Sequence, residues 1–142
     1  MRSKTGPATM MPRFTKEKPH GIGHGRLQSI LWAAKGIKFL FRTEINARLH
    51  AMATAAVLAV SIFLPLTSLE WALVAIATSM VWSAEAMNTA IEHLADMVST
   101  KPDPRIAVIK DLAAGAVLIA AIGAAIIGVL VFAPYLMQLL SG

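Results

Sequence analysis

Long apolar blocks constrain the fold of this chain more than any other feature. Residues 45–64 and 106–136 are almost continuously apolar, and a third block begins near residue 69 and continues as a helical pattern to about residue 98. About 20 apolar residues are needed to cross a ~30 Å hydrocarbon core. Hydrophobic residues make up 56% of the 142-residue chain, with a mean hydropathy of +0.64. The sequence therefore predicts an all-α integral membrane protein with three transmembrane helices.

An amphipathic segment precedes these blocks. Over residues 26–42, apolar side chains recur at three- and four-residue steps, with Lys35 and Lys38 between them. This pattern predicts a helix that lies on the inner membrane surface. Residues 1–25 are rich in Pro, Gly and Lys without apolar periodicity, and we expect a disordered basic tail that ends in a flexible GIGHG joint. Residues 26–142 would form the membrane domain.

The distribution of charge predicts an orientation. Of the 13 Lys and Arg residues, all but three lie between Arg2 and Arg48, whereas the loop LPLTSLE after the first block has none. The positive-inside rule then places the N-terminus in the cytoplasm and the C-terminus outside. Attraction to anionic lipids explains the net charge of +5 without a nucleic-acid partner. The absence of cysteine excludes disulfides and thiolate metal sites.

A polar stripe follows the inner end of the second block. Glu85, Asn88, Glu92 and Asp96 fall within a narrow arc of one helix face. A ~20-residue crossing that starts near residue 69 places Glu85 close to the inner boundary. A helix that leaves the bilayer carries charges simply because it faces water, and this accounts well for Asp96. It accounts poorly for Glu85, since a carboxylate at the boundary is costly unless it is paired or functional.

Other ionisable residues belong to the same layer. Glu44, Arg48 and His50 lie at the inner end of the first span, and Lys110 and Asp111 at the inner end of the third. Carboxylates below a basic rim suit Mg²⁺, which uses one or two carboxylates together with substrate phosphates. The layer therefore favours phosphoryl transfer to a lipid. An ion transporter would need polar residues across the whole bilayer, and a non-catalytic assembly protein would have no use for the stripe.

Three stretches resemble a known family. They are EAMNTAIEHLAD at residues 85–96, KDLAAGAVLIAA from residue 110 and GIKFLFRTEINARLH from residue 36. Over roughly residues 26–134 the chain resembles the small prokaryotic diacylglycerol kinase and undecaprenol kinase family. The resemblance implies a homotrimer of three-span protomers in the bacterial inner membrane, with active sites between protomers. It also implies transfer of the γ-phosphate of MgATP to a lipid hydroxyl. The residues of these motifs resemble undecaprenol kinases more closely, which favours undecaprenol as the lipid substrate, with diacylglycerol as the alternative.

The resemblance also implies roles for single residues. Glu85 would be the general base that takes the proton of the lipid hydroxyl, and Asn88 would orient the reacting groups. Glu92 and Glu44 would hold Mg²⁺ on the ATP phosphates.

The remaining motif positions concern the nucleotide. Lys110 and Asp111 would contact ATP, and Asp96 would support that polar network. Three positions stay open at this stage. Arg48 has either a catalytic role or pairs with Glu44. His50 either contacts the substrate hydroxyl or packs between helices, and we expect His93 to face solvent or headgroups.

Overall fold

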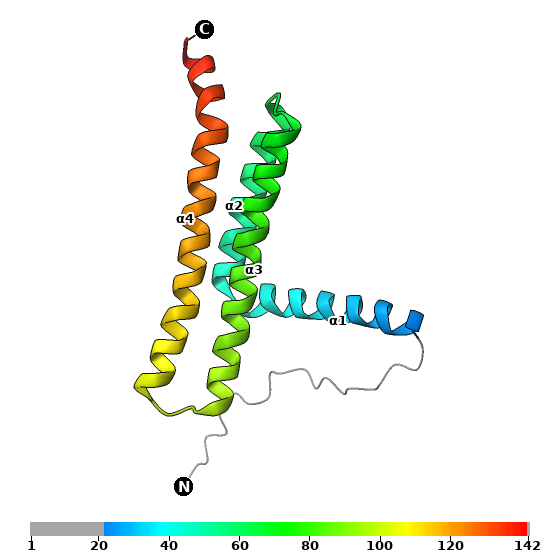
Figure 1. The fold of residues 1–142 in the computed structure, drawn as a ribbon, viewed down its shortest axis with the longest axis vertical. Coiled ribbons are helices and arrows are strands. Elements are labelled where there is room, and N and C mark those ends of the chain that lie inside the picture. Colours follow the sequence, from blue (N-terminus) through cyan, green and yellow to red (C-terminus); the bar gives the residue numbers. More distant parts are fainter. Residues whose placement is uncertain (1–21, 142) are drawn as a thin grey trace. The chain divides into compact units, whose positions relative to one another are not determined.

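The computed structural model describes residues 22–141, and all regular structure in that range is helical. Four helices follow one another: α1 (Ile22–Thr43), α2 (Ile45–Phe63), α3 (Ser68–Val98) and α4 (Pro104–Ser141). The chain divides into two compact units between Lys35 and Gly36, so the last two turns of α1 belong to the same unit as the other three helices. Within this unit α3 is central, because both α2 and α4 pack against it (Figure 1).

The helix boundaries lie near those expected from sequence, with two differences. The helix α4 continues to Ser141 through Pro134, beyond the expected end at residue 136. The helix α1 begins at Ile22, whereas we expected a flexible joint before Arg26. Glycine costs roughly 1 kcal/mol in a helix interior, and the 20 or so residues that follow are able to propagate the helix over it. The rest of the expected tail, residues 1–21, lies outside the described residues.

By length and composition, α2 and α4 are each apolar enough to cross a membrane, and they are the two described helices that meet this test. The helix α3 has 31 residues and is long enough as well. It carries Glu70 in its first turn and the acidic stripe in its second half, so its hydropathy is lower.

A hydrogen-bonded cluster closes the end of the unit at the α2–α3 loop. Thr67 caps α3 in a reciprocal box: its hydroxyl accepts from the Glu70 backbone N–H at 3.3 Å, and its own N–H donates to Glu70 Oε2 at 2.7 Å. The Tyr135 hydroxyl on α4 donates to the same Oε2 at 2.8 Å and lies 3.3 Å from the Pro65 carbonyl oxygen. The only acidic residue of this loop region is therefore used structurally, as a helix cap.

The α3–α4 loop positions the start of α4 at the opposite end. Asp103 accepts from the backbone N–H of Arg105 at 2.9 Å and from its guanidinium at 2.9 and 3.2 Å. These hydrogen bonds from Arg105 lower the pKa of the Asp103 carboxyl from its ordinary value. Pro104 occupies the first helical position, where its missing N–H costs nothing.

A one-residue junction connects the end of α1 to α2, and we call residues 39–50 the elbow. Glu44 interrupts the two helices with an extended backbone, at φ −100° and ψ 124°. The carbonyls at the end of α1 have no helical partner, and Arg48 satisfies two of them by donating to Phe41 O at 3.1 Å and Arg42 O at 2.9 Å. Arg48 thus stabilises the elbow through backbone carbonyls instead of pairing with Glu44 among the described residues.

Candidate active site

Glu85 is the most unusual side chain in the described part of the protein. Its position on α3 leaves it 1% exposed. One carboxylate oxygen, Oε2, is buried without a hydrogen-bond partner in the described residues. The nearest cationic or titratable partner is His50 on α2, whose Nε2 lies 4.0 Å from Oε2. Burying a carboxylate without a hydrogen-bond donor costs free energy, so Glu85 lowers the stability of the folded chain at this position.

The elbow brings further ionisable groups close to Glu85. Glu44, Glu92 and His50 are the charged or titratable side chains that act electrostatically on its carboxylate. Glu44 lies between helices, and its side chain makes no cap hydrogen bond to α2. Residues from the elbow and from α3 therefore meet at one place, as the shared layer in the sequence predicted.

Polar side chains next to Glu85 are buried as well. Asn88 Nδ2 donates to Glu92 Oε1 at 2.9 Å, while Asn88 Oδ1 is buried without a partner. Thr89 is 5% exposed, and its Oγ1 also has no partner. A helical threonine commonly bonds the carbonyl one turn back, so an unbonded hydroxyl is unusual. Buried polar atoms are nearly always satisfied in folded proteins, and unsatisfied ones gathered at one place are typical of a site that meets a ligand.

Aromatic contacts hold the elbow against α3. The rings of Phe39 and His93 lie 5.1 Å apart, and so do those of Phe41 and Trp82. Trp82 Nε1 also donates to Thr54 Oγ1 on α2 at 3.2 Å. These contacts fix the last turns of α1 and the first turns of α2 on both sides of Glu85. His93, expected to face solvent or headgroups, instead packs against Phe39 with a buried Nε2, although its side chain as a whole is half-buried.

A second group of predicted residues joins α3 to α4. Lys110 Nζ pairs with Asp96 Oδ1, and both side chains are partly exposed. The neighbouring Asp111 is exposed on α4 beside a shallow groove that includes Val108 and Leu112. Lys110 and Asp96 are thus brought together, whereas Asp111 makes no ion pair within residues 22–141.

Two carboxylates near Glu85 are of the chemical type that binds Mg²⁺. Within residues 22–141, no group of three or more His, Asp or Glu side chains is arranged to hold a metal ion. Glu44 and Glu92 supply hard oxygen donors, and Asn88 occupies only one oxygen of Glu92. Mg²⁺ keeps several waters and takes its other ligands from substrate phosphates, so two carboxylates are sufficient.

Comparison with known proteins decides the class of chemistry. The sequence profile of prokaryotic diacylglycerol kinases matches residues 31–132, which include every predicted site residue. The chain belongs to the prokaryotic diacylglycerol kinase family. It is therefore a lipid kinase, and the resemblance stated from its motifs is confirmed.

Two curated relatives extend this result. Undecaprenol kinase of Bacillus subtilis is 39% identical over 109 residues, which cover 77% of this chain and 89% of that protein. Diacylglycerol kinase of Synechocystis sp. is 36% identical over 115 residues, covering 80% of this chain and 66% of that protein. Relatives with both lipid specificities thus align with most of the chain.

Two features of the site were missed in the sequence. Thr89 directly follows Asn88 in the polar stripe and could have been included on that ground. The approach of His50 to Glu85 depends on how α2 docks against α3, and no spacing in the sequence indicates that contact.

Proposed function

We propose that this kinase transfers the γ-phosphate of ATP to the hydroxyl group of a membrane lipid at the cytoplasmic boundary of the bilayer. The observation that carries the proposal is Glu85, a carboxylate 1% exposed with one oxygen lacking a partner. Ionisable residues in membrane helices are costly and are usually functional. A general base needs an oxygen that is free to accept the proton, and Oε2 has no hydrogen-bond partner among the described residues.

In the proposed reaction the lipid hydroxyl gives its proton to Glu85 Oε2. The hydroxyl oxygen forms a bond to the γ-phosphorus, and the bond from that phosphorus to the bridging oxygen of the β-phosphate breaks. ADP leaves with the electron pair of the broken bond. Asn88 orients Glu92 through the hydrogen bond between their side chains. Such catalysis depends on positioning and electrostatic stabilisation more than on covalent chemistry.

Glu44 and Glu92 would hold Mg²⁺ that arrives with the nucleotide. When bound, Mg²⁺ neutralises charge on the phosphate oxygens as the γ-phosphoryl group is transferred. Lys110 and Asp111 would contact ATP, with Asp96 supporting Lys110 through their ion pair. A lysine ammonium near phosphate oxygens is a common element of phosphate binding.

The kinase would cross the inner membrane of a bacterium three times, with α3 as the second span, the N-terminus inside and the C-terminus outside. The apolar composition of α2 and α4 supports this placement. Exposed apolar side chains on α1, including Leu27, Ile30 and Leu31, support contact of that helix with the inner membrane surface. We propose that the kinase has no nucleic-acid partner.

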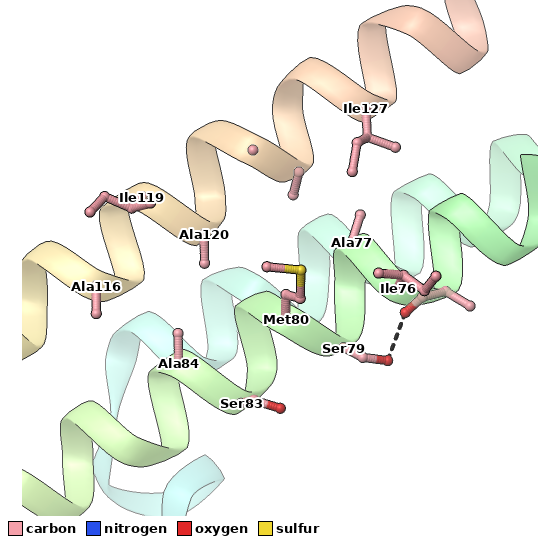
Figure 2. Close-up of a pocket in the computed structure, with 13 residues that line it drawn as sticks. Ile76, Ala77, Ser79, Met80, Ser83, Ala84, Ala116, Ile119, Ala120 and Ile127 are labelled. Atoms are coloured by element: carbon pink, nitrogen blue, oxygen red, sulfur yellow. Dashed lines mark hydrogen bonds between the residues drawn. The ribbon is translucent and has the colours of Figure 1, made fainter.

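A homotrimer is the proposed assembly. Between α3 and α4 runs a groove of about 810 Å³, with Ala77, Ala84, Ala116 and Ala120 among the residues that line it (Figure 2). Small residues let helix backbones approach closely in membranes, so the groove suits a helix from a second copy of the chain.

Undecaprenol is the favoured acceptor and diacylglycerol the alternative. The undecaprenol kinase relative is matched over 89% of its length, against 66% for the diacylglycerol kinase. Both lipids present a primary hydroxyl, so the same base and nucleotide site would serve either.

The test is transfer of label from γ-labelled MgATP in bilayers that contain both lipids. Glu85→Gln should lower transfer by at least about 100-fold, because a general base commonly contributes 10²–10⁴. Binding of a non-hydrolysable ATP analogue should be kept. Glu70→Gln is the matched control, since the same change on the same helix affects only the hydrogen bonds of Glu70 to Thr67 and Tyr135 at the α2–α3 loop. Near-normal transfer by Glu85→Gln would show that Glu85 is not the base.

A further inference from the structure

The contact between His50 and Glu85 has a geometry that suits a third atom. His50 Nε2 and Glu85 Oε2 are 4.0 Å apart, which is too long for a direct hydrogen bond. Oε2 is nevertheless buried and has no other donor among the described residues. His50 on α2 and Glu85 on α3 therefore face each other without forming a hydrogen bond.

One oxygen atom can bond to both groups. Two hydrogen bonds of about 2.6–2.8 Å that end 4.0 Å apart meet at an angle of roughly 90–100° at the shared oxygen. An alcohol oxygen has one proton to donate and lone pairs that accept, and these directions are separated by a similar angle. The carboxylate is an acceptor only, and the imidazole donates wherever Nε2 carries a proton. The carboxylate can therefore accept the proton of a hydroxyl group while the imidazole donates a hydrogen bond to the oxygen of the same group.

We propose that His50 is an acceptor-binding residue, whose Nε2–H donates to the oxygen of the lipid hydroxyl while that hydroxyl donates to Glu85. This inference rests on the proposed function and adds the group that orients the attacking oxygen. When the hydroxyl proton points to Glu85 and one lone pair of the hydroxyl oxygen accepts from His50, the remaining lone pair of that oxygen is directed at the γ-phosphorus. Orienting a reactant in this way lowers the entropic part of the barrier.

The surroundings of His50 fit the role. Its side chain is 24% exposed, whereas Glu85 is 1% exposed and its Oε2 is buried, so a hydroxyl group would approach the pair from the His50 side. The aromatic pairs Phe39–His93 and Phe41–Trp82 hold the elbow against α3 and so keep the distance between His50 and Glu85.

The experiment compares His50→Gln with His50→Leu in bilayers of defined lipid-alcohol content. The two replacements have similar volume, but only the glutamine amide donates a hydrogen bond. For His50→Leu we expect the KM for the lipid alcohol to rise about three- to tenfold, the loss expected for one hydrogen bond. His50→Gln should stay within about twofold of the unchanged enzyme. Asn46→Leu is the matched control, because it places leucine one turn earlier on α2, at an exposed position.

The KM for ATP and the binding of a non-hydrolysable ATP analogue should be unchanged in all three variants. An unchanged lipid KM in His50→Leu would overturn the proposal. So would an equal rise in His50→Gln or Asn46→Leu, or a loss of nucleotide binding, because each would make His50 a structural residue. If the unchanged enzyme labels neither lipid, the proposed function itself fails, and this outcome is visible before any variant is compared.

Discussion

Lys110 on α4 and Asp96 on α3 form an ion pair between side chains that stay 35% and 58% exposed. An exposed pair of this kind adds about 0–1 kcal/mol to stability. The contact therefore does little to hold α3 against α4, which pack through apolar and small residues along their length. The position of Lys110 suits its proposed contact with a phosphate oxygen of ATP.

Replacing Lys110 by methionine should separate nucleotide binding from folding. We expect the KM for ATP to rise about tenfold or more, since a hydrogen bond to a charged group is worth about 1.5–3 kcal/mol. The thermal midpoint should change little, because the ion pair is exposed. Kinetics at varied ATP concentration measure the KM for ATP, and a melting curve in detergent measures the thermal midpoint. Lys101→Met, in the α3–α4 loop, is the control, and an equal effect there would argue for general surface charge.

Asn88→Leu should raise the Mg²⁺ concentration needed for half-maximal activity. The amide orients Glu92 through the 2.9 Å hydrogen bond, and loss of such an orienting partner typically costs 10–100-fold in metal affinity. Titration of activity with Mg²⁺ at saturating ATP measures the change. Asn46→Leu, at an exposed position in the first turn of α2, should leave the titration unchanged. A lowered maximal rate with an unchanged Mg²⁺ requirement would contradict the orienting role.

Tyr135→Phe should lower the thermal midpoint by a few degrees and leave transfer unchanged. The variant loses the hydrogen bond from the Tyr135 hydroxyl to Glu70 Oε2 that ties α4 to the α2–α3 loop. The proposed catalytic groups lie in the second half of α3, away from Glu70, so the KM values for ATP and lipid serve as internal controls. A drop in activity without a drop in melting temperature would be inconsistent with a purely structural tie.

The Asp103–Arg105 contact predicts a small dependence of stability on pH. Hydrogen bonds from Arg105 lower the pKa of Asp103 in the folded chain below its ordinary value of 3.8. The stabilisation is therefore complete above pH 3.8 and is lost as pH falls through the lower folded pKa. The melting temperatures of the unchanged protein and Asp103→Asn should differ at pH 6 and converge once the pH has fallen below the lowered pKa of folded Asp103. A difference that persists in acid would assign the effect to helix capping alone.

Helix positions were predictable here because apolar length and the breakers Pro65 and Pro104 are written locally in the sequence. The polar stripe was predictable too, since Glu85 and Glu92 share a face at helical spacing. Contacts between helices were not predictable in this way. Whether Trp82 meets lipid or Phe41, and whether Arg48 pairs with Glu44 or with carbonyls, depends on docking angles that no local pattern specifies.

The candidate site draws on the elbow, on α3 and on the start of α4, three regions separated along the chain by the loops at residues 64–67 and 99–103. During synthesis, Lys110 emerges after every other group named in the mechanism except its neighbour Asp111. With the proposed roles, a chain whose last helix is not yet inserted would have Glu85 but no complete nucleotide site. With these roles, ATP consumption would begin only after the start of α4 has been made, and the order of residues along the polypeptide would set that delay.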